Sequence, residues 1–191
     1  MHRTLTLALA LVGFMTVPSL CRAQATDERA AMEALKTAAQ RAMAPMMWLV
    51  GDWEGPATIT MAPGRTMTLT QRETVRAAAF DQALIIQGRG SMTAGANENV
   101  VFEAAGLFAY DAHSKRFLFT SSSGSGAAGT HETTVDGTTL TWAYSVGPMK
   151  MRYVISRTAD DRWHETGAVS RDGGATWATN FEMTLRRKSR S

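Results

Sequence analysis

The pattern of apolar and polar positions changes near Val50, from a helical period to the period of β-strands. Between residues 26 and 43 apolar side chains recur at helical spacing, which predicts a helix with one apolar stripe. Pro45 follows and is expected to end it. From Trp53 onward the apolar residues alternate within short segments, as in half-buried strands. The stripe of the predicted helix consists of Met32, Leu35, Ala39 and Met43.

Turn-forming residues divide the chain after Trp53 into short strands at regular spacing. Asp136-Gly137 and Gly147-Pro148 are examples, and the first is typical of a two-residue hairpin turn. None of the connections is long enough for a crossover helix. The sequence therefore predicts an all-β fold, an antiparallel up-and-down barrel of about ten strands within a range of roughly eight to ten. The helix over 26–43 is expected to cap one mouth of this barrel.

Alternation also predicts which side chains face the interior of the barrel. The last strands carry aromatic and methionine residues on one face and Lys150, Arg152 and Glu182 on the other. The apolar face is expected to point inward, and a barrel of this size has room for one small ligand. The predicted apolar wall consists of Trp142, Tyr144, Met151, Tyr153, Phe181 and Met183.

The same alternation places polar residues on inward faces. Glu73, Arg89, Glu103 and Glu165 share faces with apolar residues of their strands. A buried carboxylate is costly unless it is paired, and Arg89 is the expected partner for Glu73 or Glu103. These residues either orient a ligand in the apolar pocket or form a hydrated, inert cluster at the mouth. Both readings stay open, because a register slip of one residue reverses every face.

The first 25 residues have the features of a secretory signal peptide. A short basic start precedes the apolar run Leu5–Val17, and Ala23-Gln24-Ala25 offers small residues at the cleavage site. A lipoprotein signal would require a small residue before Cys21, where Leu20 stands. We therefore expect cleavage after Ala25, export to the periplasm or the exterior, and one domain over residues 26–191.

Composition narrows the possible partners of the mature chain. Removing Arg3 and Arg22 from the 20 Lys and Arg residues leaves 18, against 17 acidic residues. This near-neutral balance argues against a nucleic-acid partner. Cleavage also removes Cys21, the one cysteine, and with it any disulfide, thiol nucleophile or cysteine-based metal site. No second apolar run suggests an integral membrane segment after signal removal.

No catalytic constellation stands out in the sequence. His131-Glu132 is too small for a metal site, because consecutive strand residues point to opposite faces. Ser121-Ser122-Ser123 lacks a nucleophile-elbow pattern and is interpreted as a flexible loop. Gly88-x-Gly90 opens no helix and so predicts no phosphate site. No metal site is expected, and no catalytic residue is assigned.

Four motifs together resemble an uncharacterised family of exported bacterial proteins with a lipocalin-like, calycin-type β-barrel, a domain of unknown function. The resemblance covers nearly the whole mature chain and implies the barrel fold without implying an activity. It also implies that Trp53 packs under Arg186 or Arg187 of the last strand, a cation–π contact that closes the barrel floor. The motifs are Trp48-Leu49-Val50-Gly51-Asp52-Trp53-Glu54-Gly55, Gly88-Arg89-Gly90, Arg162-Trp163-His164-Glu165 and Ser170-Arg171-Asp172-Gly173-Gly174-Ala175-Thr176-Trp177.

A more distant resemblance concerns nitrobindin-like proteins, which share the helix followed by Gly-x-Trp-x-Gly and a ten-stranded barrel. That resemblance implies haem with an axial histidine. His164 is the best placed candidate, but alternation points it outward, and His113 falls in a predicted turn. Haem therefore remains an alternative, and the main interpretation requires no cofactor.

The segment Ser170-x-Asp172-x-Gly174-x-Thr176-Trp177 resembles the Asp-box hairpin of sialidases. In such a hairpin the serine and aspartate side chains bond the turn backbone, and the tryptophan packs beneath it. Sialidases carry several boxes, whereas this chain has one. We interpret Asp172 and Trp177 as structural residues of a turn and do not expect glycosidase activity.

The sequence therefore predicts an exported protein that binds a small apolar or amphipathic molecule inside its barrel. Its predicted site combines the aromatic and methionine wall with the polar residues Glu73, Arg89, Glu103 and Glu165. The alternative is an enzyme, a hydrolase or isomerase, with Glu103 or Glu165 as acid or base. A third possibility is a filled barrel that acts as a packing or interaction module.

Overall fold

A computed structural model describes residues 19–94 and 97–189, with side chains described over 27–92 and 97–189. Residues 1–18, which hold most of the predicted signal peptide, lie outside the described residues. The described chain begins with helix α1 (Ser19–Met43) and a short 3-10 helix, η1 (Ala44–Leu49), before ten strands. The strands are β1 (Gly51–Ala62), β2 (Arg65–Ala78), β3 (Ala83–Ala94), β4 (Asn97–Asp111), β5 (Arg116–Ser123), β6 (Ala128–Asp136), β7 (Thr139–Val146), β8 (Met149–Arg157), β9 (Trp163–Ser170) and β10 (Ala178–Arg187).

Helix α1 begins at Ser19 and not at Thr26, the predicted start. The intervening residues are mainly good helix formers and contain neither proline nor glycine, so nothing in the sequence stops the helix there. The chain divides into two compact units, Met1–Ala34 and Leu35–Ser191. Among the described helices, none combines the length and apolar content needed to cross a membrane.

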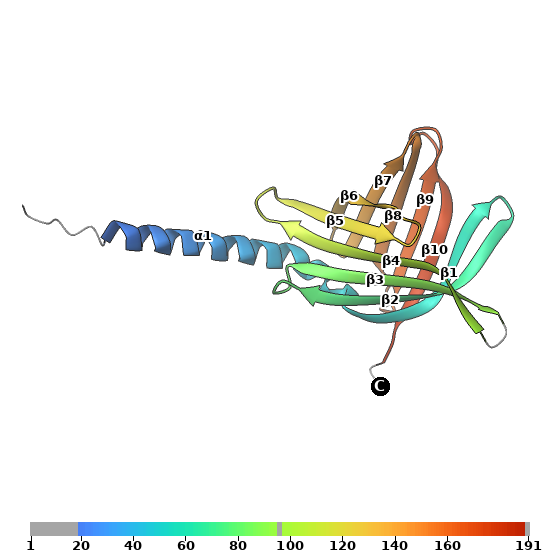
Figure 1. Ribbon diagram of the computed structural model, residues 1–191, viewed down its shortest axis with the longest axis horizontal. Helices are drawn as coiled ribbons and strands as arrows, with labels where there is room; N and C mark the ends of the chain where they lie inside the picture. The colour runs from blue at the N-terminus through green and yellow to red at the C-terminus, as the bar shows by residue number, and fades with distance from the viewer. Residues whose placement is uncertain (1–18, 95–96, 190–191) are drawn as a thin grey trace, which may run out of the picture. The chain divides into compact units, whose positions relative to one another are not determined.

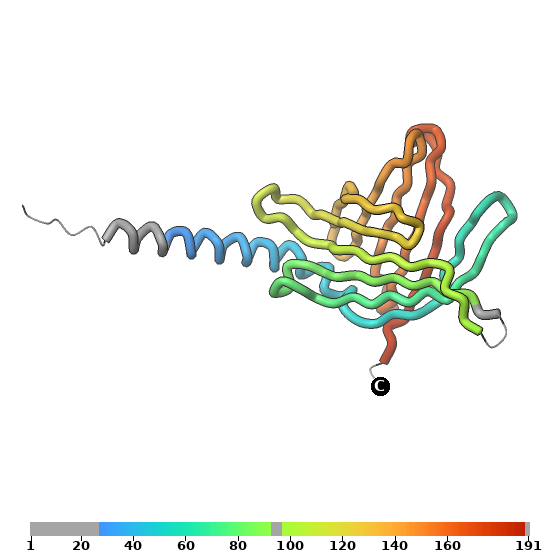
Figure 2. Tube along the Cα trace, viewed as in Figure 1, coloured from blue at the N-terminus to red at the C-terminus, as the bar shows by residue number. Residues whose placement is uncertain are grey.

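The ten strands form a closed antiparallel barrel in which each strand pairs with its neighbours in sequence, as Figures 1 and 2 show. β1 pairs with β10, for example through Trp53 opposite Arg187, and this pairing closes the barrel. Hairpin turns include Gly64, Gly137 and Gly147, which adopt positive φ angles that favour glycine. The prediction of an all-β, up-and-down, ten-stranded barrel is confirmed.

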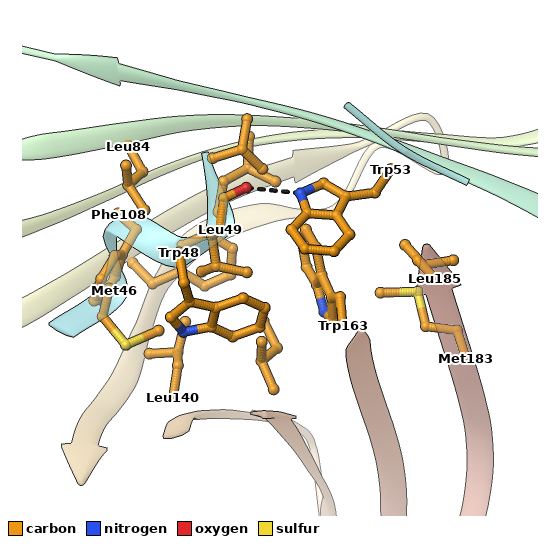
Figure 3. Packing of buried hydrophobic residues seen from close by; sticks show 14 of the residues in the cluster. Met46, Trp48, Leu49, Trp53, Leu84, Phe108, Leu140, Trp163, Met183 and Leu185 are labelled. Atoms are coloured by element: carbon orange, nitrogen blue, oxygen red, sulfur yellow. Dashed lines mark hydrogen bonds between the residues drawn. The ribbon is translucent and has the colours of Figure 1, made fainter. Parts of the chain in front are cut away.

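One end of the barrel is filled by the segment that precedes β1. Met43, Met46 and Leu49 are fully buried in a cluster with residues from the adjoining strand ends, and Trp48 is nearly so. Figure 3 shows Trp48 and Met46 beside Leu84, Phe108 and Leu140. We call this end the floor. The predicted cap is therefore formed by the last turns of α1 together with η1, whereas Met32 of the expected stripe is 64% exposed.

Three tryptophans from separate segments meet at the floor. The rings of Trp48, Trp53 and Trp163 lie edge to face, with centroids 5.9 to 6.3 Å apart. The indole of Trp53 donates a hydrogen bond to the carbonyl of Leu49 at 2.8 Å, the dashed line of Figure 3. Such edge-to-face pairs stabilise a core beyond the area they bury.

Arg187 completes the floor from the end of β10. Its guanidinium lies 4.1 Å from the centre of the Trp53 ring and donates hydrogen bonds to the carbonyls of Trp48 and Val50. The expected contact between Trp53 and a basic residue of the last strand is therefore present. Arg186, the other candidate, is exposed like Arg187, but it stands opposite Glu54 across the strands and does not contact Trp53. Strand alternation explains this difference, because neighbouring residues of β10 point to opposite sides.

Candidate functional site

A cavity of about 1190 Å³ occupies the barrel interior. Glu73 and Trp163 line it at the floor end, and Gly126, Val146 and Trp177 line it at the opposite strand ends. Eight to ten strands enclose enough space for a small ligand when the inward side chains do not fill it. The cavity is therefore the natural candidate for a binding site.

An aromatic wall forms one side of the cavity. The rings of Trp142 and Tyr153 are stacked with centroids 4.3 Å apart, and Tyr144 lies parallel to both. Strand register explains this arrangement, since Trp142 pairs with Tyr153 and Tyr144 pairs with Met151. All six residues of the predicted apolar wall line the cavity: Trp142, Tyr144, Met151, Tyr153, Phe181 and Met183.

Two buried glutamates line the cavity near the floor. Glu73 on β2 and Glu165 on β9 are each 7% exposed. Burial raises the pKa of Glu73 to about 7, although Gln71 donates a 2.7 Å hydrogen bond to its Oε1. Burial, and then the charge of Glu73, raise the pKa of Glu165 to about 8. Both carboxyl groups therefore hold protons more tightly than usual, and their inward placement was predicted from alternation.

Glycines on β3 leave room for these polar side chains. A Cβ atom at Gly88 would lie 2.6 Å from Oε1 of Glu73, and one at Gly90 would lie 2.8 Å from Oε1 of Gln71. The inner face of β3 thus accepts the polar groups of β2 by having no side chain there. This explains the Gly88-x-Gly90 motif, for which the sequence alone offered no reason.

Arg89 and Glu103, also predicted to face inward, lie on the outer surface. They pair across β3 and β4 with their charged groups 3.7 Å apart, and both side chains are more than half exposed. Their inward assignment was wrong because both faces of these strands carry apolar residues. Ile85 and Leu107 are 46% and 48% exposed, while the inner face carries the small residues Gly88, Ala104 and Gly106 between larger ones.

A histidine–serine pair lies in the cavity and was not predicted from the sequence. Nε2 of His131 lies 2.7 Å from Oγ of Ser121, and the imidazole contacts the rings of Phe119, Trp142 and Tyr144. Burial lowers the pKa of His131, which favours the neutral ring. Ser121 belongs to β5 and not to a loop. The pairing of β5 with β6 brings the two residues together, and no local sequence signal reports that register.

The described residues do not fit the alternative of a haem site. His164 points away from the cavity, and its Nδ1 lies 3.1 Å from Oγ1 of Thr184. His113 follows β4 in a turn, where its backbone N–H donates to Asp111. His131 faces the cavity, but its Nε2 already bonds Ser121. Within the described part of the chain, no group of three or more metal-binding side chains forms a cluster.

Three buried polar atoms at the cavity have no hydrogen-bond partner among the described residues: Nε1 of Trp142, Nε1 of Trp163 and Oδ1 of Asn180. The indole of Trp163 adjoins Glu165 and favours its ionised form, but no hydrogen bond of ordinary geometry joins them. A strand irregularity between Thr179 and Phe181 places Asn180 at the cavity, which alternation could not predict. Unpaired buried polar atoms are costly and point to partners outside the chain.

The hairpin between β9 and β10 lies at the mouth and has the predicted internal bonds. Asp172 accepts hydrogen bonds from the side chain and backbone of Thr176 and from Ser170. These bonds, those from Thr176 foremost, hold the pKa of Asp172 well below its usual range. The indole of Trp177 bonds the carbonyl of Gly174, and Arg152 stacks on its ring at 4.4 Å. The hydrogen bonds within the hairpin agree with its interpretation as a structural turn.

Comparisons with known proteins give the fold and a family. A family model described as "Protein of unknown function (DUF1579)" matches residues 39–187. The crystal structure of Rv2717c from M. tuberculosis is similar at a TM-score of 0.52 and 13% identity, covering 79% of this chain and 98% of that one. The S-type phycobiliprotein lyase CPES from Guillardia theta is similar at 0.52 and 11% identity, covering 76% and 92%. No curated protein sequence matches the chain.

Proposed function

The chain belongs to the DUF1579 family of proteins of unknown function, and from its cavity we propose that it is a binding protein for a small apolar or amphipathic molecule. The proposed site is the barrel interior, with the aromatic and methionine wall as its apolar side and the carboxyl groups near the floor as its polar end. The signal-peptide features of residues 1–25 support export of this protein.

The observation that supports the binding function most directly is the cavity. Its volume of about 1190 Å³ lies somewhat above the range of roughly 300–1,000 Å³ that is usual for small-molecule sites. An apolar wall with a few convergent polar groups is the usual composition of such sites. The similarity to a phycobiliprotein lyase agrees with a small-molecule site in a barrel of this fold, and it extends no further than the fold.

Native mass spectrometry tests the proposal directly. We expect the native protein, purified from an export-competent host, to exceed its denatured mass by a few hundred daltons. We also expect an apolar fluorescent dye to bind the purified protein in solution. Absence of both the mass excess and dye binding would contradict the proposed function.

A matched pair of substitutions locates the binding in the cavity. Ala104 lines the cavity on β4, between the small residues Gly88 and Ser123 of the neighbouring strands. Ala104→Trp should fill this space and weaken dye binding about tenfold or more. Leu107→Trp places the same ring on the outer face of the same strand and should leave binding unchanged. Equal effects of the two variants would place the dye elsewhere.

A second candidate function is catalysis by Glu165. A buried carboxyl group with a pKa near neutrality suits general acid–base work on a ligand in the same cavity. Glu165→Gln should then keep ligand binding and abolish turnover. In a binding protein the same variant changes affinity alone. Glu103, the other predicted acid or base, lies on the outer face and does not reach the cavity.

A further inference from the structure

Resting on the binding function proposed above, we propose that the ligand carries a protonated amine, which Glu73 and Glu165 bind at the floor end of the cavity. The apolar part of the ligand then lies along the aromatic wall. This assigns a chemical class to the ligand: small amphipathic amines, and not fatty acids or neutral lipids.

No cation of the described chain lies beside the two glutamates. Among the described residues, every ion pair joins groups outside the cavity, and none involves Glu73 or Glu165. Of the basic residues that line the cavity, Lys150 and Arg152 are exposed, and Arg152 stacks on Trp177 at the mouth. The third, His131, bonds Ser121, and burial lowers its pKa, which favours the neutral ring. A ligand is therefore the source of positive charge that would complement the two glutamates in their ionised form, replacing the protons that they otherwise hold.

The second argument concerns charge and hydrogen bonding. An ammonium group has three N–H donors and no acceptor, whereas a carboxylate only accepts. A protonated amine near Glu73 and Glu165 would form charge-assisted hydrogen bonds with both and offset their repulsion. A ligand carboxylate would instead bring a buried negative charge without a cation to compensate it, and would disfavour ionisation of the two glutamates further. An alcohol would form hydrogen bonds with the glutamates but would bring no positive charge.

Unpartnered polar atoms give an independent argument. Trp163 is 1% exposed, lines the cavity and has an indole N–H without a hydrogen-bond partner among the described residues. Oδ1 of Asn180 is an acceptor without a donor on the same cavity. Asn180 lies three residues before Met183, which is opposite Glu165, so a second donor on the ligand would bond it. The Trp163 indole adjoins Glu165 and favours its ionised form, which is the form that binds an ammonium group.

Glycine at position 88 makes room for the carboxyl group of Glu73 at the cavity. A Cβ atom there would lie 2.6 Å from Oε1 and 2.9 Å from Oε2 of Glu73. The carboxyl group therefore occupies space that a larger residue would take, and it remains at the cavity surface. A structural glutamate would need no such arrangement, because a buried apolar residue would fill the same position at lower cost.

Three probes of equal chain length test the charge preference: octylamine, octanol and octanoate, titrated into the purified protein at pH 7 with tryptophan fluorescence as readout. We expect octylamine to bind at least about tenfold more tightly than the other two. In Glu73→Gln, Glu165→Gln and the double variant, octylamine should lose this advantage while octanol binds as before. Glu103→Gln removes a carboxylate from the outer face and should keep the preference.

The outcomes separate this inference from the proposed function. Binding of octanol or octanoate without a preference for octylamine would overturn the inference and leave a binding protein. A preference that survives in the double variant would also overturn it. Failure of all three probes and of the apolar dye would overturn the proposed function itself. Circular dichroism of each variant confirms that the barrel is folded, and glutamine matches the shape of a protonated glutamate.

Discussion

At the scale of single residues, Glu165 is the position where stability and function conflict. It lies 7% exposed on the inner face of β9, between Trp163 and the apolar wall. An apolar side chain would stabilise the barrel more, because a buried carboxyl group must stay protonated or find a partner. A buried ionisable residue at a position where an apolar residue would be more stable is commonly functional.

We predict that Glu165→Gln stabilises the ligand-free protein at alkaline pH. The pKa of Glu165 in the folded state is about 8, against an ordinary value of 4.5. The unfolded chain therefore releases a proton that the folded protein keeps. The stability associated with this group is complete below the unfolded pKa and is lost as the pH rises through about 8. The loss should be on the order of 3 kcal/mol between pH 5 and pH 9.

Urea denaturation at pH 5 and pH 9 measures this difference. Glu165→Gln should unfold at a similar urea concentration to wild type at pH 5 and at a clearly higher one at pH 9. Glu103→Gln, an exposed carboxyl group, should follow wild type at both values. A variant less stable than wild type at pH 9 would mean that the carboxylate has a stabilising partner. The other ionisable groups that line the cavity are common to all three proteins: Glu73, His131, Glu132, Tyr144, Lys150, Arg152 and Tyr153.

At the scale of elements, the contact between β10 and the segment before β1 closes the floor. Arg187 joins them by stacking on Trp53 and by donating to the carbonyls of Trp48 and Val50. One side chain thus bonds a carbonyl in the last turn of η1 and the carbonyl just after it. Arg186, its neighbour in sequence, is exposed on the other face of β10.

We therefore predict that Arg187→Ala destabilises the barrel and that Arg186→Ala does not. Loss of the cation–π contact and of hydrogen bonds to two carbonyls should lower the free energy of unfolding by about 2 kcal/mol. Arg186→Ala should change it by less than about 0.5 kcal/mol. Chemical denaturation of the two variants under the same conditions gives both values. Equal effects would show that net charge, and not this contact, determines the stability.

The contrast between strands explains how much of the site the sequence could predict. On β7 and β8 one face is aromatic and the other polar, so alternation placed Trp142 and Tyr153 correctly. On β3 and β4 both faces are apolar, and the inner face has small residues such as Gly88 and Ala104. Alternation therefore assigned the larger outer residues to the interior, and Arg89, which shares their face, was wrongly predicted to point inward. Local pattern predicts a face when the two faces differ in polarity, and fails when cavity space requires small residues.

Contacts between strands were beyond prediction for a different reason. The bond between His131 and Ser121 depends on the register of β5 against β6, and Asn180 reaches the cavity through an irregularity in β10. Neither has a signal in the local sequence. The closed barrel itself was predictable, because regularly spaced turns with no crossover helix leave few other topologies.

At the scale of the whole molecule, the barrel has two unlike ends. The floor is packed by α1 residues from Ala39 onward and by η1, and the family match begins at the same residue, Ala39. The other end leaves the cavity lined by residues of the strand ends and loops, such as Gly126 and Trp177. Ligand entry is therefore expected at the mouth, while the polar groups that would hold a ligand lie near the floor.

This division predicts which part of the N-terminal segment the barrel needs. A chain that begins at Leu35 keeps every residue of the buried cluster and should unfold within about 0.5 kcal/mol of the full-length protein. A chain that begins at Val50 lacks Met43, Met46, Trp48 and Leu49. Each such side chain contributes about 1.5–3 kcal/mol when buried, so their loss approaches the total stability of an ordinary domain. Near-ultraviolet circular dichroism and thermal unfolding distinguish the two chains. A native barrel in the shorter chain would show that the ten strands are stable without a packed floor.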